Sequence, residues 1–517
     1  MKYYLIIILP VLLLAASCRD LGNYDYTEIN EMKSVEGIED TYYAYSKSTT
    51  LNISPRVTFS MDTEHKGQYN YEWKIVPVGN TSGEGTVIGR EATLTYPVTV
   101  EEGDYILYYK IKDISTDVLW MTHTTLKVSS PVSRGFLLIG DHADGYAVME
   151  MIAMPADGSP AVLMRDLLAD SGLPRQKGAL NVIYTGSTCT KSPRLWFMTD
   201  EQSYYVDPKT FSSSVSNQLG SMVFTSFPMD NGVGPIDVAP RGTRNLELSP
   251  YSNNNRYIMC NNGYVFGGSI SSGEYYQNPM NRYSKTDTEV FPTAPYMMYA
   301  MGNDWGVSSM VFYDQEKERF VFGTYSNNYV KESTLVDKEG DLFPWNQAST
   351  GLTLKYAENT LYDDVRSGST FALMSDDVNN VIYKFVVYSS KANKLGFYTV
   401  KPIATDFNRA SHYAFSSKRT VLFYSVGSTL YAYDYNSGNE RVESFGDMGG
   451  EITMLKFDIQ SKSDFDDLYV ATYNTTDQGT LRKFVLGQNP DHISLTEDQT
   501  FTWTHLSRIK QMEWRNK

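Results

Sequence analysis

The feature that most constrains the fold is a series of seven similar hairpin-like segments between Arg134 and Leu486. Each segment has an apolar run, a polar or glycine-containing turn, and a second run rich in Tyr, Phe and Val. The segments are RGFLLIGDHADGYAVMEMIAM, RLWFMTDEQSYYVDPKTF, NRYIMCNNGYVFGGSI, SSMVFYDQEKERFVFGT, STFALMSDDVNNVIYKFVVY, TVLFYSVGSTLYAYDYNSGNER and DLYVATYNTTDQGTLRKFVL. They recur roughly every 40 to 60 residues, a period typical of β-propeller blades.

Two turns support hairpins in this region. Asn262-Gly263 and Gly427-Ser428 are pairs that tight hairpin turns favour, because glycine reaches positive φ without strain. The pattern predicts a β-propeller-like domain over residues 131–517 with about seven blades, and six or eight remain alternatives. The final run FTWTHLSRIKQMEW is too long to complete a blade, so we expect its last strand to close the ring against the first blade.

Residues 35–130 have a different texture. Short alternating runs (LNISPRVTFS, YNYEWKIVPV, ATLTYPVTV, DYILYYKIKDIS and LWMTHTTLKVSS) are separated by turn-forming residues. This spacing predicts an immunoglobulin-like β-sandwich with Trp73 in its core. The stretch VSSPVSRG, around Ser130-Pro131, is the expected boundary between the two domains. The predicted fold class is therefore all-β, a sandwich followed by a propeller.

The N-terminus carries an export signal. Lys2 is followed by the apolar run LIIILPVLLLAA, which is too short to span a bilayer as a helix and suits the core of a signal peptide. Small residues then lead into Cys18, in the pattern of a bacterial lipobox. We expect residues 1–17 to be removed, Cys18 to be lipidated, and residues 18–34 to form a tether. An ordinary secretory signal beside an unrelated cysteine is the alternative.

Cys18, the following DLGNYDYTEIN, the sandwich and the propeller pattern together resemble the PKD-like family of Bacteroidetes surface lipoproteins. The most specific part of the resemblance is GNYDYTEIN, from Gly22 to Asn30. Members are typically encoded beside SusC/SusD-like outer-membrane importers of glycans or oligopeptides. The resemblance therefore implies an outer-membrane lipoprotein that faces the cell exterior, with such an importer and its companion lipoproteins as partners. It implies no catalytic residues.

Composition and motifs narrow the function. A net charge of -15 argues against nucleic-acid binding, which needs a basic surface. The sequence contains no G-x-S-x-G elbow, HExxH motif or phosphate-binding loop, and its six histidines lack ligand spacing. We expect no catalytic residues, metal or cofactor, and we expect a non-enzymatic binding or accessory subunit of the importer. A propeller hydrolase acting on the same cargo and a purely structural partner are the alternatives. Cys189 and Cys260 could form a disulfide or remain free thiols.

Candidate contact residues lie in two long connections that are too rich in Pro, Asn and aromatic residues to be simple turns. Aromatic side chains stack on sugar rings or hold peptide side chains at low entropic cost. We therefore predict ligand or partner contact by Tyr275, Tyr276, Tyr283, Tyr296, Tyr299 and Trp305 of the first connection, and by Phe343 and Trp345 of the second. The alternative is that these rings fasten the connections to the propeller.

Overall fold

The computed structural model divides the chain into two compact units, Met1–Pro131 and Val132–Lys517. It describes residues 28–46, 49–81, 83–130, 132–154, 160–185, 194–241, 255–271, 273–300, 307–325, 328–361, 368–461 and 464–516. The signal peptide, Cys18 and most of the segment from Gly22 to Asn30 lie outside these residues.

The first unit is built from nine short strands in the described part of the chain. They are β1 (Met32–Glu36), β2 (Thr41–Tyr45), β3 (Thr50–Ile53), β4 (Arg56–Phe59), β5 (Tyr69–Pro77), β6 (Thr86–Gly89), β7 (Leu94–Pro97), β8 (Gly103–Asp113) and β9 (Leu119–Ser129). Five of them form a sheet in the order β2-β9-β8-β5-β6, while β1 pairs with β4 and β3 pairs with β7. Among the strand pairs described in this unit, β2 and β9 are parallel and the others are antiparallel.

Alternation along the strands places one face of each sheet in a shared core. In β5, Trp73 and Ile75 are buried, whereas Glu72 and Lys74 are partly exposed. The Trp73 ring stacks on Tyr109 of β8 with ring centroids 4.3 Å apart, and its Nε1 donates to the Glu91 carbonyl at 3.0 Å. The predicted tryptophan-centred sandwich core is therefore present.

The second unit consists of seven antiparallel sheets in its described residues, which we number in chain order. Sheet 1 has β10 (Arg134–Asp141), β11 (Ala147–Ala153), β12 (Val162–Met164) and β34 (Arg508–Asn516); sheet 2 has β13 (Ala179–Tyr184), β14 (Leu195–Thr199) and β15 (Tyr204–Val206); sheet 3 has β16 (Pro235–Ala239), β17 (Asn255–Cys260) and β18 (Val265–Ser269); sheet 4 has β19 (Ser309–Asp314), β20 (Arg319–Thr324) and β21 (Tyr329–Lys331). Sheet 5 has β22 (Thr353–Asn359), β23 (Thr370–Ser375), β24 (Asn380–Val387) and β25 (Ala392–Thr399); sheet 6 has β26 (His412–Phe415), β27 (Val421–Val426), β28 (Thr429–Asp434) and β29 (Arg441–Asp447); sheet 7 has β30 (Glu451–Phe457), β31 (Asp467–Asn474), β32 (Gln478–Leu486) and β33 (Leu495–Leu506).

The two ends of this unit meet in sheet 1. β34 pairs antiparallel with β10 along the length of both strands, from Arg134 opposite Asn516 to Asp141 opposite Arg508. The expected pairing of the last strand with the first hairpin is thus observed. The two turns singled out in the sequence are also as expected, since Gly263 (φ +83°) and Gly427 (φ +61°) adopt the left-handed conformation between paired strands.

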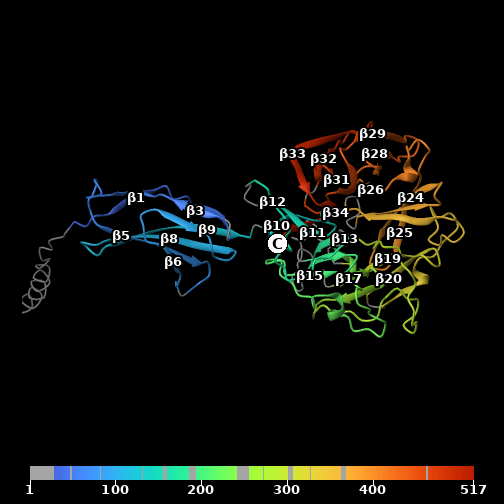
Figure 1. Ribbon diagram of the computed structural model, residues 1–517, viewed down its shortest axis with the longest axis horizontal. Coiled ribbons are helices and arrows are strands. Elements are labelled where there is room, and N and C mark those ends of the chain that lie inside the picture. The colour runs from blue at the N-terminus through green and yellow to red at the C-terminus, as the bar shows by residue number, and fades with distance from the viewer. Residues whose placement is uncertain are drawn as a thin grey trace, which may run out of the picture. The chain divides into compact units, whose positions relative to one another are not determined.

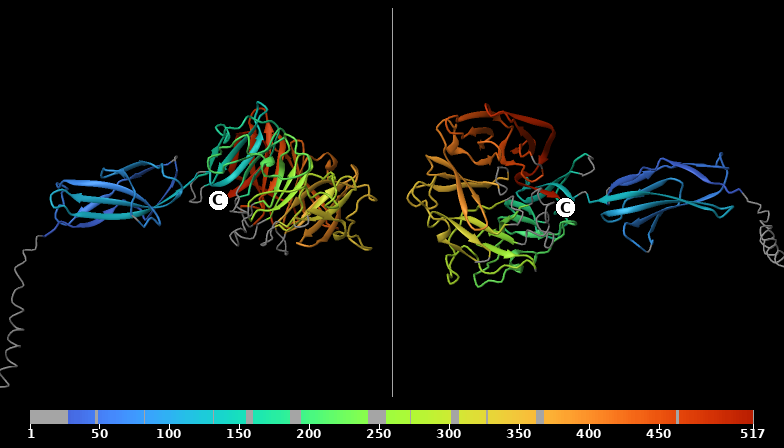
Figure 2. Two further views of the ribbon diagram at one scale, coloured as in Figure 1. Left: turned by 90° about the horizontal axis from the view of Figure 1, so that it is seen from below. Right: turned by 180° about the vertical axis from the view of Figure 1, so that it is seen from behind.

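Hydrophobic clusters connect the sheets of the second unit one after another. In the described residues, one cluster joins each sheet to the next, from sheet 1 through sheet 7. A further cluster returns from sheet 7 to sheet 1, where Phe136 of β10 and Trp514 of β34 pack with Tyr469 of β31. Figures 1 and 2 show the sheets of this unit following one another in chain order.

Helical structure in the described residues is limited to short 3₁₀ turns: Leu219–Met222, Glu332–Thr334 and Phe407–Arg409. Among these residues there is no helix with the length and apolar character needed to cross a membrane. The thiol of Cys260 is buried and free, and burial raises its pKa. Cys189, the partner considered for it, lies outside the described residues.

Candidate functional site

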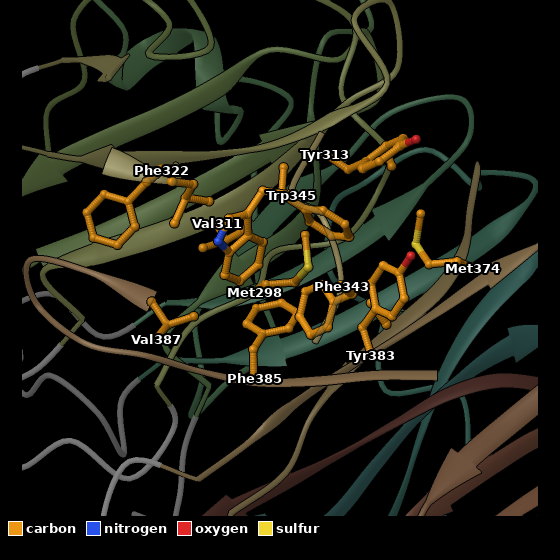
Figure 3. Close-up of a cluster of buried hydrophobic side chains, with 14 of the residues drawn as sticks. Met298, Val311, Tyr313, Phe322, Phe343, Trp345, Met374, Tyr383, Phe385 and Val387 are labelled. Carbon is orange, nitrogen blue, oxygen red and sulfur yellow. The ribbon is translucent and has the colours of Figure 1, made fainter. Parts of the chain in front are cut away.

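Three of the predicted contact residues are packed in the core of the second unit. Phe343 and Trp345 are buried between sheets 4 and 5, where Figure 3 shows them among Val311, Tyr383 and neighbouring side chains. The Phe343 ring stacks on Tyr383 at 4.1 Å, and the Trp345 backbone N–H donates to Asp337 Oδ1 at 2.6 Å. These two rings fasten their connection to the sheets and offer no face to a ligand, which corrects the prediction for them.

Tyr276 is also a packing residue, because it belongs to a buried ionic group. Its hydroxyl donates to Glu274 Oε1 at 2.7 Å, and that carboxylate is paired with Arg256 at 2.7 Å and with Arg194 at 2.8 Å. The Glu274 side chain is fully buried, and its ion pairs keep its pKa below the usual value although burial opposes them. This arrangement holds one end of the long connection in place.

Other members of the predicted set differ in their surroundings. Tyr275 is 59% exposed beside Phe224, which is 67% exposed, with ring centroids 5.7 Å apart. Tyr283 is half-buried, donates to Asp314, and carries the Lys317 ammonium 3.6 Å above its ring. Trp305 lies outside the described residues.

Tyr296 and Tyr299 both line a cavity of about 240 Å³ in the second unit. This cavity is the candidate site, because several charged side chains line it as well. The other lining residues are Asn181, Ile236, Asp237, Arg241, Pro295, Met297, Tyr356, Ala357, Glu358, Asn359, Leu455, Lys456, Phe457, Ile459, Gln460 and Gln511. The strands that contribute, β13, β16, β22, β30 and β34, each stand at an end of the strand order of their sheet. Edge strands of different sheets therefore converge on one space.

A four-charge network connects three lining residues, Asp237, Arg241 and Lys456, to the buried carboxylate of Glu513. Arg241 Nη2 donates to Asp237 Oδ1 at 2.9 Å, and its Nη1 donates to Glu513 Oε2 at 3.4 Å. Lys456 Nζ lies 3.8 Å from the same Glu513 oxygen, and Gln460 Nε2 donates to Glu513 Oε1 at 3.0 Å. Burial lowers the pKa of Lys456 to about 8 against the attraction of Glu513, and burial raises the pKa of Glu513 against the attraction of Arg241 and Lys456.

Glu358 supplies a separate carboxyl from β22. Its Oε2 accepts hydrogen bonds from the Phe415 N–H at 2.8 Å and from the Tyr356 hydroxyl at 3.2 Å. Burial raises the pKa of Glu358 to about 7, and the two hydrogen bonds oppose that rise. The cavity thus holds a carboxyl and an amine that both titrate near neutrality, a property that clusters at functional sites.

Two amides complete the polar lining. Asn359 Nδ2 donates to the Met297 carbonyl at 2.8 Å, and its Oδ1 accepts from the Tyr299 N–H at 3.0 Å. Asn181 Nδ2 donates to the Ile236 carbonyl at 3.0 Å. Its Oδ1 is buried and has no hydrogen-bond partner among the described residues, which is uncommon for a buried acceptor.

Sequence reasoning found Tyr296 and Tyr299 but missed the charged residues of the cavity. Asp237, Glu358 and Lys456 of the lining, and the buried Glu513 that pairs with Arg241, stand on four different strands that are far apart along the chain. The available signal was a charged residue between two apolar ones, as in IDV (residues 236–238) and LKF (residues 455–457). Strands that are buried on both faces are otherwise almost entirely apolar.

Metal binding has no support in the described part of the chain, where no group of His, Cys, Asp and Glu side chains has a metal-binding arrangement. The acidic turn at Asp376 illustrates why. Its carboxylate accepts the backbone N–H groups of Val378 and Asn379, which makes it a turn residue.

In its described residues the chain combines an all-β unit of three sheets with a larger all-β unit of seven sheets. The model of the PKD-like family matches residues 18–171. The match covers the first unit and continues through β10, β11 and β12 of the second. No curated protein matches the chain.

Solved structures give distant likenesses. A quinonprotein alcohol dehydrogenase-like protein from Bacteroides thetaiotaomicron aligns with a TM-score of 0.39 and 12% identity, over 95% of this chain and 100% of that one. A candidate 6-phosphogluconolactonase from Bacteroides uniformis aligns with a TM-score of 0.36 and 10% identity, over 86% of this chain and 100% of that one. TM-scores this low do not establish a shared fold. The fold described above therefore rests on the strand pairings and hydrophobic clusters alone.

Proposed function

We propose that the protein is a lipid-anchored, non-enzymatic binding protein and that its second unit is a seven-bladed β-propeller. Seven successive sheets, the clusters that lead from each sheet to the next, and the β10–β34 pairing support the propeller. In such a ring the innermost strand of each blade faces a central channel. The cavity lined by edge strands is that channel and the binding site.

The observation that carries a binding function is the state of the charges around the cavity. Glu513 and Asp237 are both engaged by Arg241, and Glu513 also accepts from Gln460. Groups held in this way are arranged to recognise polar atoms, and among the described residues no Ser, Cys or His of the lining stands ready as a nucleophile or general base.

The location and partner are proposed from the N-terminal sequence. Lipidation at Cys18 would hold the chain at the outer membrane, and the resemblance of residues 22–30 to the PKD-like family supports a partnership with a SusC/SusD-like importer of oligopeptides or glycans. The protein would present or hold cargo for that importer. Its acidic surface is compatible with neutral sugars and with basic peptides.

Detergent extraction of outer membranes followed by affinity capture of the full chain tests this proposal. We expect the importer pair to be recovered with it, and Cys18→Ala to release the protein from the membrane or leave it unprocessed. A Cys18→Ala chain that stays quantitatively in membranes from cells lacking the importer would contradict the lipid anchor. Recovery of the wild-type chain without any importer component would contradict the partnership.

A propeller hydrolase is the second candidate, because Glu358 has a pKa of about 7 and lines the same cavity as Lys456. A carboxyl that titrates near neutrality can act as a general acid or base. Steady turnover of an oligosaccharide or peptide by the purified protein, abolished by Glu358→Gln, would establish this function in place of simple binding.

A further inference from the structure

We propose that the cavity binds a small zwitterion of dipeptide size, whose carboxylate contacts Arg241 and Lys456 and whose ammonium contacts Glu358. This inference rests on the proposed binding function and names its ligand class. It follows from the signs, partners and size of the groups that line the cavity.

Both cations of the lining can receive a carboxylate. Arg241 and Lys456 have side chains that are 18% and 17% exposed, so part of each remains open to the cavity. At 3.8 Å, Lys456 Nζ is too far from Glu513 for a charge-assisted hydrogen bond, and its backbone bond to the Met512 carbonyl uses one donor of three. Counted over the part of the chain that the structure describes, the ammonium of Lys456 therefore retains donors for a ligand.

Acceptors for an ammonium and a peptide N–H are also present. Both hydrogen bonds that Glu358 accepts among the described residues reach Oε2, which leaves Oε1 for the ligand. Asn181 lines the cavity, and its buried Oδ1 has no hydrogen-bond partner among the described residues. A ligand N–H at this oxygen would give that acceptor a partner.

The charges around the cavity favour a ligand that carries an ammonium. Arg241 and Lys456 are already balanced by Asp237 and Glu513, so the ionised carboxylate of Glu358 adds one further negative charge. A ligand ammonium offsets that charge in a space of low dielectric, and a carboxylate on the same ligand contacts the two cations.

Size separates this ligand from a polymer. A cavity of about 240 Å³ is smaller than the roughly 300–1,000 Å³ of pockets for drug-sized ligands. It suits a dipeptide or an amino acid and is too small for an oligosaccharide chain.

Calorimetric titration of the mature full-length chain tests the proposal with defined probes. These are alanyl-alanine, its N-acetyl form, its C-terminal amide, free alanine and maltose. We expect alanyl-alanine to bind, and either blocked form to bind at least about tenfold more weakly, since each block removes one charge-assisted contact. This comparison uses the wild-type protein and does not depend on the folding of a variant.

Two substitutions assign the ends of the ligand. Glu358→Gln should weaken the binding of alanyl-alanine about tenfold and leave the binding of its N-acetyl form unchanged, because that form has no ammonium. Lys456→Met should likewise weaken the binding of alanyl-alanine about tenfold and leave the binding of the C-terminal amide unchanged, because the amide has no carboxylate. The exposed residues Glu443 and Lys391 provide matched controls as Glu443→Gln and Lys391→Met, which should leave all affinities unchanged. Thermal unfolding of each variant verifies that it is folded.

The alternative outcomes are distinct. Equal binding of the blocked and free dipeptides, binding of maltose alone, or no binding of any probe would overturn the zwitterion proposal. Free alanine binding as tightly as the dipeptide would overturn the dipeptide size. If importer copurification persists while every probe fails, the ligand class is wrong and the importer association stands. If the dipeptide binds and no importer component is recovered, the ligand class stands and the importer association is wrong.

Discussion

The two units differ in how their apolar side chains are shared. In its described residues the first unit has a single cluster, centred on Trp73, to which both sides of the sandwich contribute. The second unit divides its core into clusters that each belong to two neighbouring sheets. A sandwich with a single shared core should fold and unfold cooperatively, as one unit. The larger unit should tolerate local loosening as long as the first and last sheets remain joined.

The largest effect should follow removal of β34. Deleting residues 508–517 removes the strand paired with β10 and the buried side chains Ile509, Met512 and Trp514. The lost burial is worth about 5 kcal/mol or more, and the deletion exposes a sheet edge. We expect hydrogen exchange measured by mass spectrometry to lose protection throughout the second unit. Deleting residues 516–517 alone is the control, and equal protection in the two truncated chains would refute closure by β34.

Trp73→Ala should have the next largest effect. Removal of this fully buried ring costs about 3–5 kcal/mol, a large share of the stability of a small domain. Exchange protection should fall across all strands of the first unit and stay unchanged in the second. Met121→Ala, at an exposed position on β9 of the same sheet, should change little. Loss of protection confined to β5 and β8 would show that the sandwich core is not cooperative.

Phe343→Ala tests the divided core of the second unit. We expect a loss of about 3 kcal/mol, because the ring stacks on Tyr383 in a packed cluster. Exchange should increase in sheets 4 and 5 and remain slow in sheets 1 and 7. Tyr275→Ala, at the exposed aromatic of the other long connection, should stay within about 0.5 kcal/mol of wild type. Uniform loosening of all seven sheets by Phe343→Ala would mean that the clusters act as one core.

The smallest effect concerns the pH dependence of the second unit. Burial raises the folded-state pKa of Glu358 from 4.5 to about 7, with Lys456 opposing the shift and the hydroxyls of Tyr356 and Tyr435 nearby. The stability associated with the protonated carboxyl is present below pH 4.5 and is lost as the pH rises through 7.

Glu358→Gln should abolish that dependence. The variant should match wild type near pH 4.5 and exceed it by about 2–3 kcal/mol at pH 7.5, as measured by urea unfolding at both values. Exposed Glu443→Gln should give no such difference. If the difference in stability between wild type and Glu358→Gln does not change with pH, the pKa of Glu358 is not raised in the folded protein.

Sequence periodicity was sufficient for the local structure and for part of the topology. The seven hairpin-like segments correspond to paired strands, and the long C-terminal run supplied the strand that joins β10, because alternation and turn chemistry are local properties. The aromatic connections were harder to interpret. Phe343 and Tyr275 are the same kind of residue in the same kind of segment, yet one is buried and the other exposed. Composition does not separate these cases, since burial depends on which sheet the connection meets.

The charged cavity could not be predicted from the sequence because it depends on how separate sheets meet in space. Asp237 and Glu513 are brought to the same arginine by strands from different sheets. Each charge alone is typical of a solvated position, and only the three-dimensional arrangement makes it part of a network.

The β10–β34 pairing has a consequence for how the protein is made. β10 is synthesised near the start of the second unit, and its partner arrives only when the chain is nearly complete. Contacts between residues so distant along the chain make folding slow, since a very long loop must close before the pairing contributes any stability. A chain crossing a membrane from its N-terminus would expose the bare edge of β10 until its last residues emerge, and it would depend during that interval on whatever protects nascent strands from aggregation.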